Sequence, residues 1–542
     1  MIAVQIKWIM QKIHASCLNE ENVKRELEST VKRVSTDTRT LQKGDVFIAL
    51  VGPNFNGHNY IETAITRGAS CVIVSQKISS NIPILMVSDT RIALGLLGAA
   101  IKDKVSPKTI GITGSSGKTT VKEMVSSILG HCGKVLATKG NFNNDIGVPL
   151  TLLELEEHHD YAVIEMGANH QGEIEYTSKL VKPDVATIVN ASPAHIEGFG
   201  SLFGVARAKS EMVKGLDNKS IAILNADSQF YDYWQSNTNT NQVLTFSYDT
   251  TNGDFHAKNV FVNAEGCAEF ELVTPIGNAP IRLRVPGLHN VGNAVLSAAL
   301  AMSAGASLVN VRQGLFAMKS VTGRLTVKVA SDKVKVIDDT YNANVGSVKA
   351  AIDLLATFKG FRVFVFGDMG ELGDQAAMYH NQIGEYAVSK NIDALISCGP
   401  LSAHASAAMQ EKGMACGNKT DAYQALMRLI GPILSSHFPN NTHPTQSVMA
   451  LFEKQNNANS QTDLPQPTMH LENSPTFNKQ SSIPVTILVK GSRSAKMETL
   501  VESVLSFDFS QPEDDVEDSH QNQFVSGNMT PSNSEMIDKE QK

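Results

Sequence analysis

The chain has 542 residues, of which 42% are hydrophobic and 19% are charged, and its formal net charge is −7. This length exceeds what one compact core supports, so we expect roughly two to four domains. The composition is that of an ordinary globular protein. The acidic charge is spread along the chain without a basic stripe, which argues against nucleic acid as a partner.

The six cysteines stand singly, and no two have the spacing of zinc ligands or of a thioredoxin-like pair. Cysteines used in this way fit a reducing compartment. Gln5 and Lys7 interrupt the apolar N-terminal segment before it could form a signal-peptide core. No later apolar run is long enough to cross a bilayer. We therefore predict a cytoplasmic protein without membrane insertion.

The first unit of the chain, residues 1 to 105, contains short apolar runs separated by helical stretches. The runs VFIAL (46–50), CVIVS (71–75) and ILMVS (84–88) are candidates for buried strands. This pattern predicts a smaller N-terminal α/β domain.

A second unit, residues 106 to 322, alternates apolar strands with helical segments. The strand candidates are YAVIE (161–165), VATIVN (185–190) and IAILN (221–225). Such alternation predicts a mostly parallel sheet covered by helices.

The third unit, residues 323 to 508, repeats this alternation and predicts a C-terminal Rossmann-like domain. Within it, a segment at about 435–482 is dense in Asn, Gln, Ser, Thr and Pro, and the polar tail at 509–542 is similar. Because such segments bury little apolar area, we predict that both are disordered. The strand candidates are 334–339, 361–368, 393–399 and 485–491.

The segment GITGSSGKTT (111–120) has the strand–loop–helix context of a phosphate-binding loop. Gly114 and Gly117 let the backbone approach phosphates, Lys118 brings a charge, and the Thr119 hydroxyl is a ligand for Mg²⁺. The alternative is a glycine-rich turn before a helix, since the strict pattern has a glycine where Ile112 stands. We expect this loop to bind the phosphates of ATP through Gly114, Ser115, Ser116, Gly117, Lys118, Thr119 and Thr120.

Five predicted strands end in polar clusters. In open parallel sheets, ligands bind beyond the carboxyl ends of the strands. A single polar cluster after a strand is usually the cap of the following helix, but five such clusters at one edge of a sheet favour a ligand-binding site. Glu165 is the natural partner of Thr119 on Mg²⁺. His195 by itself could be structural, but its place in a loop beside the proposed nucleotide pocket favours a ligand.

The segment 289–302 reads as a helix. His289, Asn290 and Asn293 share one face at its start. These polar side chains could cap the helix or recognise the edge of a base, and composition leaves both alternatives open.

Taken together, these segments resemble the Mur ligases over about residues 31 to 508, without the segment at 435–482. The resemblance includes the shifted first glycine of the phosphate loop. It rests on GITGSSGKTT (111–120), GNFNNDIGVP (140–149), EMGANHQGEI (165–174), NASPAHIEGFGS (190–201), ARAKSE (206–211) and GLHNVGNA (287–294), which occur in the family's order.

The resemblance implies roles for individual positions. Lys118 would hold phosphates, Arg324 would contact a phosphate, and Asp339 would contact the ribose. Lys209 matches a position that carries a carbamylated lysine, without which it would pass for a solvated surface lysine. The implied catalytic residues are Lys118, Glu165, His195, Lys209 and Arg324; the implied metal ligands are Thr119, Glu165, His195 and carbamylated Lys209; and the adenine-side residues are Asn290 and Asn293.

The segments DDTYNAN (338–344), GDMGELG (367–373) and LVKGSRS (488–494) resemble the members that use ATP and Mg²⁺ to join D-alanyl-D-alanine to UDP-N-acetylmuramoyl-tripeptide. The Asp-Asn-Pro-Arg motif of the members that add the third residue is absent. Val345 and Gly346 stand where the family usually has a proline. The implied substrate contacts are Ser35, Asp37, Thr38 and Arg39, in a segment similar to a uridine-nucleotide site, with Asn141, Asn144, Tyr341, Asn342 and Asn344.

Three alternatives stay open at this point. The closest is a related amide ligase of the folylpolyglutamate or cyanophycin synthetase type. The others are a binding protein that has kept the fold without hydrolysis and a motor or transport ATPase. We also expect a monomer, and the sequence leaves the third peptide residue, meso-diaminopimelate or lysine, undecided.

Overall fold

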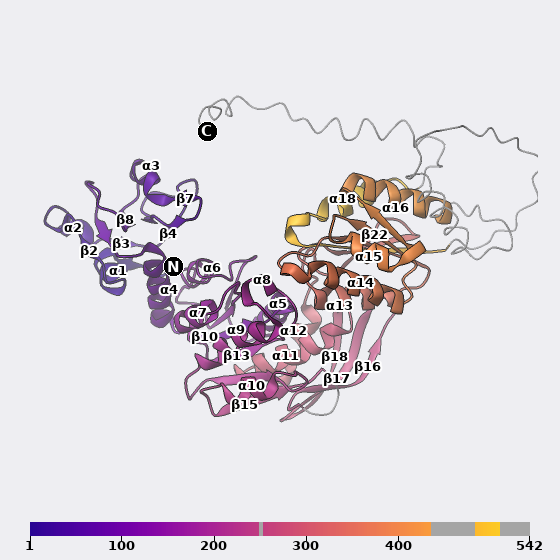
Figure 1. Ribbon diagram of the computed structural model, residues 1–542. Helices are drawn as coiled ribbons and strands as arrows, with labels where there is room; N and C mark the ends of the chain where they lie inside the picture. Colours follow the sequence, from indigo (N-terminus) through magenta and orange to yellow (C-terminus); the bar gives the residue numbers. More distant parts are fainter. Residues whose placement is uncertain (249–252, 435–482, 510–542) are drawn as a thin grey trace, which may run out of the picture.

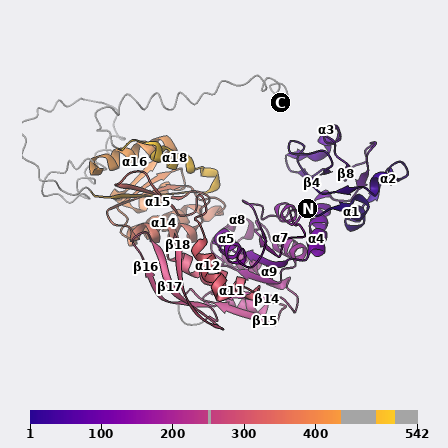
Figure 2. The same cartoon turned by 180° about the vertical axis from the view of Figure 1, so that it is seen from behind.

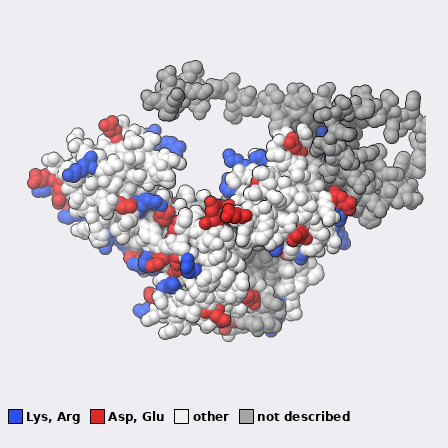
Figure 3. Space-filling view, in the orientation of Figure 1, with Lys and Arg blue, Asp and Glu red and all other residues white. Residues whose placement is uncertain are grey.

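The structure, a computed structural model, describes residues 1–248, 253–434 and 483–509. It has three α/β domains, and the N-terminal and C-terminal domains lie on opposite sides of the central one (Figures 1 and 2). Figure 3 shows an open hollow between the two outer domains, with acidic and basic side chains interspersed on this face. The predicted disordered segment at 435–482 and the tail beyond 509 lie outside the described residues.

The N-terminal domain is built on a five-stranded sheet in the order β2-β9-β8-β5-β4. All pairs are parallel except β2 with β9. The three predicted strands are confirmed as β5 (Val46–Ile48), β8 (Cys71–Val74) and β9 (Ile84–Met86). The other elements are β2 (Ser16–Cys17), β4 (Val34–Ser35), α1 (Ile6–Lys12), α2 (Lys24–Leu27), α3 (Ile61–Thr66) and the pairs β1 (Val4–Gln5) with β3 (Thr30–Val31) and β6 (Val51–Gly52) with β7 (Phe55–Asn56).

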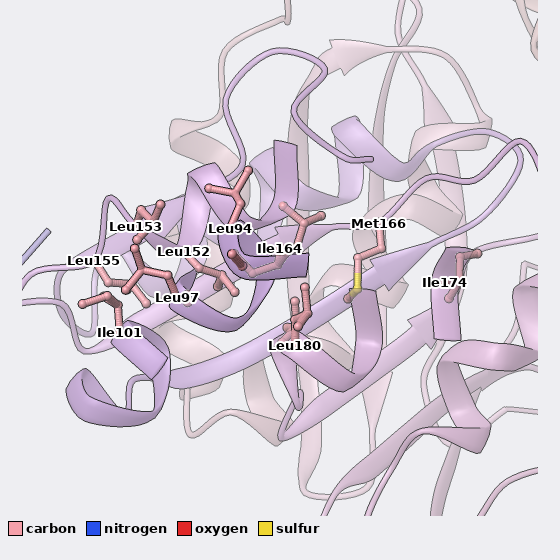
Figure 4. Close-up of a cluster of buried hydrophobic side chains, with 14 of the residues drawn as sticks. Leu94, Leu97, Ile101, Leu152, Leu153, Leu155, Ile164, Met166, Ile174 and Leu180 are labelled. Carbon is pink, nitrogen blue, oxygen red and sulfur yellow. The ribbon is translucent and has the colours of Figure 1, made fainter. Parts of the chain in front are cut away.

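Helix α4 (Thr90–Val105) joins this domain to the central one. Asp89 caps its start by accepting hydrogen bonds from two backbone N–H groups. Leu94, Leu97 and Ile101 are three and four residues apart, so they share one face, and all three are fully buried. Figure 4 shows them packed with side chains of the central domain. Each such side chain contributes roughly 1.5–3 kcal/mol by leaving water, so α4 anchors the two domains together.

The central domain has a six-stranded parallel sheet in the order β11-β12-β10-β13-β14-β15. Helices α5, α11 and α12 cover one face, and α7 and α9 cover the other. The mostly parallel sheet is thus as predicted. The strands are β10 (Lys108–Thr113), β11 (Val135–Ala137), β12 (Tyr161–Glu165), β13 (Val185–Ile188), β14 (Ile221–Asn225) and β15 (Gln242–Phe246); the helices are α5 (Lys118–Leu129), α6 (Gly147–Leu152), α7 (Glu173–Val181), α8 (Ile196–Phe199), α9 (Leu202–Lys214), α10 (Tyr231–Ser236), α11 (His289–Ser303) and α12 (Leu308–Ala317).

A three-stranded antiparallel sheet, β16 (His256–Val262), β17 (Cys267–Thr274) and β18 (Gly277–Pro286), was not predicted. Burial alternates along β18, since one side packs on α11 and α12 while the other faces solvent. This alternation is the signature of a half-buried antiparallel strand.

The C-terminal domain has a six-stranded sheet in the order β19-β20-β24-β21-β22-β23, in which only β19 runs antiparallel to its neighbour. The last strand of the chain, β24, therefore sits between β20 and β21. Helices α13, α14 and α15 cover one face, and α16 and α18 cover the other. The elements are β19 (Thr326–Val329), β20 (Val334–Asp339), β21 (Phe361–Gly367), β22 (Ala394–Cys398), β23 (Gly413–Cys416), β24 (Val485–Lys490), α13 (Val345–Thr357), α14 (Ala376–Ser389), α15 (Ala403–Ala408), α16 (Lys419–Leu434) and α18 (Glu498–Ser506).

The three-domain α/β architecture is thus confirmed, with a phosphate-loop sheet at the centre. Among the described residues, the helices are all too short or too polar to span a membrane.

Candidate active site

The phosphate loop follows β10, the central strand, and leads into α5. Gly114 and Gly117 have φ values of +155° and +78°, the conformations that favour glycine. A Cβ atom on Gly117 would lie 3.0 Å from Asn293 Oδ1, so the space above the loop is closed to a side chain. The Lys118 ammonium donates to the carbonyl of Gly114 at 2.8 Å and so folds back over the loop. This is a cradle of the size and charge that phosphates need.

Asn190, at the end of the neighbouring strand β13, fixes this loop. Its side-chain oxygen accepts from the backbone N–H of Ser116 at 3.0 Å, and its backbone oxygen accepts from the N–H of Ser115 at 3.1 Å. The loop is therefore held in shape by the adjacent strand end.

A cavity of about 730 Å³ opens above the loop, between the central and C-terminal domains. It brings together most of the predicted site residues, which come from both domains. Those that line it are Ser115, Ser116, Gly117, Lys118, Thr119, Thr120, Asn141, Glu165, His195, Lys209, Asn290, Asn293, Arg324, Asp339, Tyr341, Asn342 and Asn344.

Glu165 ends β12 beside the loop and is buried. Its carboxylate accepts from the Thr119 hydroxyl at 3.0 Å and from the Asn143 amide at 2.9 Å. Among the described residues, no cluster of three or more His, Cys, Asp or Glu side chains could hold a metal alone. One carboxylate and one hydroxyl beside a phosphate cradle nevertheless fit Mg²⁺, which is bound by few protein oxygens together with water and phosphate.

Lys209, on α9, is 2% exposed. Burial, together with the nearby positive charge of Lys118, lowers the pKa of its ammonium group to about 7. Its Nζ lies 5.6 Å from the centre of the Phe199 ring, and the negative charges of Glu211, Glu173 and Glu165 oppose the lowering of its pKa. A substantial fraction of this amine is therefore neutral near pH 7 and available for chemistry. Burial likewise lowers the pKa of Lys118.

On the other side of the cavity, Asp339 is fixed by neighbours of its own domain. It accepts from the ammonium of Lys490 at 2.6 Å and from the backbone N–H of Leu325 at 3.2 Å. Lys490 is almost fully buried and also donates to the carbonyl of Asn342 at 2.9 Å. Burial lowers the pKa of Lys490, opposed by the charge of Asp339.

Asn290 and Asn293 are buried at the start of α11. Asn290 donates to the carbonyl of Pro286 at 2.6 Å, and Asn293 donates to the Asn290 side chain at 2.9 Å. No side chain caps α11, whose N-cap is Leu288, so the capping alternative is wrong; both asparagines line the cavity, and recognition of a base edge stays a prediction. Burial lowers the pKa of the adjacent His289 to about 4.

The C-terminal domain reaches across the cavity at three points. The Arg324 guanidinium donates to the Thr119 hydroxyl at 3.1 Å, and the Asn344 amide donates to the carbonyl of Ser115 at 3.2 Å. His195 Nδ1 lies 2.5 Å from Glu371 Oε2, and this contact lowers the pKa of Glu371. The domains are therefore docked on both the phosphate loop and the loop that carries His195.

Not every predicted site residue lines the cavity. Asn144 instead accepts from the N–H of Gly147 and begins α6. Gly114 lies within the loop, and the four predicted substrate residues of the N-terminal domain lie outside the cavity. In the N-terminal domain, the Asp37 carboxylate forms an ion pair with Arg39 at 2.7 Å. The other two predicted substrate residues of this domain are Ser35 and Thr38.

Sequence reasoning missed several cavity residues, among them Asn143, Tyr248, Lys490 and Arg493. It also missed the cross-domain contact of Glu371. The segments that carry the family resemblance include four of these residues: Asn143, Lys490, Arg493 and Glu371. Their place in those segments was the signal in the sequence that could have identified them.

Comparisons with known proteins agree with this geometry. The models for the Mur ligase catalytic domain, middle domain and glutamate ligase domain match residues 30–107, 112–301 and 323–433. The chain therefore belongs to the Mur ligase family and is an ATP-dependent ligase that forms a carbon–nitrogen bond.

Within the family, the relatives named UDP-N-acetylmuramoyl-tripeptide--D-alanyl-D-alanine ligase include proteins from Escherichia coli and Haemophilus influenzae. The protein from Escherichia coli is 46% identical, over 74% of this chain and 88% of its own. The protein from Haemophilus influenzae is 40% identical, over 93% and 99%. The crystal structure of MurF from Acinetobacter baumannii has a TM-score of 0.80 at 34% identity and covers 94% of this chain and 100% of its own.

Proposed function

We propose that this chain joins D-alanyl-D-alanine to UDP-N-acetylmuramoyl-tripeptide and cleaves ATP to ADP and phosphate, giving the pentapeptide precursor of peptidoglycan. The observation that carries the proposal is the shared cavity. It sets a phosphate loop, a buried carboxylate and a cross-domain arginine around one space, in a chain whose relatives bear this ligase's name. The alternative of a folylpolyglutamate-type ligase rests on structures 15% identical, which share the fold alone.

Formation of an amide from a carboxylate in water is uphill, so the carboxylate must first be activated. In the proposed reaction, the terminal carboxylate of the tripeptide attacks the γ-phosphate of ATP, which gives an acyl phosphate and ADP. The amine of D-alanyl-D-alanine then attacks the acyl carbon, a proton is lost from nitrogen, and phosphate leaves. The first step brings two negative groups together, and the second builds negative charge on the acyl oxygen and the leaving phosphate, so the protein's task is neutralisation and positioning.

Lys118 of the central domain and Arg324 of the C-terminal domain would supply positive charge to the phosphates. Asn290 and Asn293 lie on the adenine side, and Asp339 would bind the ribose. Docking of the C-terminal domain would exclude water, which would otherwise hydrolyse the acyl phosphate.

The residues that would hold Mg²⁺ are Thr119, Glu165 and His195, with Lys209 as a carbamate. A carbamate forms when a neutral amine attacks CO₂, and the lowered pKa of Lys209 supplies that neutral amine near pH 7. When bound, Mg²⁺ supplies charge that stabilises the phosphate oxygens during transfer.

The peptide end of the substrate would lie against Asn141, Tyr341, Asn342 and Asn344. Its uridine end would reach the N-terminal domain at Ser35, Asp37, Thr38 and Arg39. We place the reaction in the cytoplasm, since all six cysteines are free, as a reducing compartment allows.

The experiment is product detection by mass spectrometry after enzyme, ATP, Mg²⁺, UDP-tripeptide and D-alanyl-D-alanine are mixed. We expect the wild-type chain to make the UDP-pentapeptide and Lys118→Ala to remain folded and make none. Lys108→Ala removes an exposed lysine from β10 and serves as the matched control with full activity. An active Lys118→Ala enzyme, or a wild-type enzyme that accepts glutamate and not the dipeptide, contradicts the proposal.

A further inference from the structure

The contact between His195 and Glu371 joins two domains at the edge of the cavity. His195 precedes α8 of the central domain, and Glu371 precedes the short 3₁₀ helix Gly373–Gln375 of the C-terminal domain. Glu371 Oε2 lies 2.5 Å from His195 Nδ1. The ring N–H and the carboxylate are close without full alignment, and the Glu371 side chain, 57% exposed, can rotate into line.

The backbone supports this side-chain contact. The N–H of Glu197 donates to the carbonyl of Glu371 at 3.4 Å, and a Cβ atom on Gly373 would lie 3.8 Å from the Cα of Glu197. The two loops therefore touch along their main chains, and the side chains meet within a formed interface.

Both residues of the contact have left-handed backbones. The φ of His195 is +53° and that of Glu371 is +63°. Such a conformation is uncommon for a residue other than glycine, and its cost persists only where surrounding structure enforces it. Here it occurs on both sides of one contact, which turns the imidazole and the carboxylate toward each other.

This arrangement has a chemical meaning for a metal-binding histidine. Such a ring usually donates one N–H to a carboxylate or carbonyl, which fixes its orientation and leaves the other nitrogen for the cation. In His195 the carboxylate lies at Nδ1, so Nε2 is the nitrogen left available. The ring of Phe199 packs edge-on against His195 at 6.4 Å and lies beneath Lys209 Nζ, so the other side of His195 is also constrained.

We propose that Glu371 is a positioning residue that orients His195 for the cation, so that the C-terminal domain completes a metal site belonging to the central domain. The inference rests on the proposed function, because it takes His195 as a ligand of the Mg²⁺ used with ATP. Loss of Glu371 is then expected to weaken binding of the cation, although Glu371 itself does not contact the cation.

The test measures binding of Mn²⁺, a probe for the Mg²⁺ site visible by electron paramagnetic resonance, in the presence of the non-hydrolysable β,γ-imido analogue of ATP. Glu371→Ala is expected to weaken Mn²⁺ binding by roughly ten- to hundredfold, the range found when a carboxylate behind a metal-binding histidine is removed. Asp374→Asn removes an exposed carboxylate from the 3₁₀ helix that follows Glu371, and is expected to bind Mn²⁺ as the wild type does.

A double-mutant cycle separates positioning from a general effect on the fold. If Glu371 acts through His195, then adding Glu371→Ala to His195→Ala causes no further loss of Mn²⁺ affinity. Equal affinity of Glu371→Ala and Asp374→Asn, or losses that add in the double variant, would overturn the inference. Equal circular dichroism spectra confirm that all variants fold.

The wild-type chain distinguishes failure of the inference from failure of the proposed function. If the wild type makes UDP-pentapeptide and binds Mn²⁺ with the analogue, while Glu371→Ala binds it equally well, only the inference fails. If the wild type makes no pentapeptide and binds no Mn²⁺ with the analogue, the proposed function fails and the inference with it.

Discussion

Replacement of Lys490 by Met tests how the C-terminal domain holds Asp339, the residue we assign to the ribose. The two are partners in register at the ends of the neighbouring strands β20 and β24. The side chain of Lys490 is 1% exposed and that of Asp339 is 10% exposed. Met keeps the length of the side chain but removes its charge and both of its hydrogen bonds, to Asp339 and to the carbonyl of Asn342.

The loss of stability in Lys490→Met follows from the charge of Asp339, which remains buried without its partner. Removal of one partner from a buried ion pair costs about 3–5 kcal/mol, because the remaining charge is buried without compensation. Asp339 keeps the N–H of Leu325 and borders the cavity, so we expect the lower end, about 3 kcal/mol. Lys490→Met combined with Asp339→Asn removes the unpaired charge and should recover most of this stability, although not the ribose contact.

Hydrogen exchange followed by mass spectrometry tests this prediction, because it measures the stability of individual segments in a protein of several domains. At about 1.4 kcal/mol per factor of ten, amides of β20 and β24 should exchange roughly a hundredfold faster in Lys490→Met. Lys390→Met, which breaks an exposed pair with Asp353 in the same domain, should leave these amides unchanged. Exchange in Lys490→Met equal to that control, or a double variant as fast as the single one, would refute the reasoning.

Three further predictions concern the cavity. Gly117→Ala places a Cβ at φ +78° and 3.0 Å from Asn293 Oδ1; the left-handed backbone alone costs roughly 1–2 kcal/mol, and calorimetry should show about a tenfold loss of ATP affinity. His289, whose pKa burial lowers to about 4, takes up its proton more readily when unfolded, at about pH 6.5. Stability should therefore fall, by less than about 3 kcal/mol, as pH drops through this interval, and His289→Asn should flatten the thermal-unfolding profile there. Bicarbonate should reactivate enzyme prepared without CO₂ at pH 8, where Lys209 is mostly neutral, and Lys209→Arg should not respond in the pentapeptide assay.

The features that were predicted from sequence are those encoded locally. The phosphate loop needs only an apolar strand, glycines where φ is positive and a following helix, and all of these are contiguous. The polar endings at Glu165, His195 and Asp339 could be gathered at one edge because parallel strands share a direction. The strands that were predicted are all present, and their ends were misplaced by at most two residues.

The features that were missed depend on pairing across long distances in the chain. Lys490 meets Asp339 because β24, the last strand, inserts beside β20, and no local pattern fixes that register. The contact of Glu371 with His195 depends in addition on how two domains dock. The antiparallel sheet β16–β18 was missed although burial alternates along it, since the preceding parallel pattern was extended over it.

The docking of the domains explains why the site is divided as it is. The central domain carries Lys118, Thr119 and Glu165, which we propose hold the nucleotide, while Arg324 and Glu371 belong to the C-terminal domain. Phosphoryl transfer to the peptide needs charge on every side of the γ-phosphate, so a nucleotide bound to the central domain alone is not yet poised to react. In the proposed reaction, the same docking would close the cavity over the reacting groups. We therefore expect activation of the peptide acid and exclusion of water to be coupled, so that an acyl phosphate forms only where the amine, and not water, can reach it.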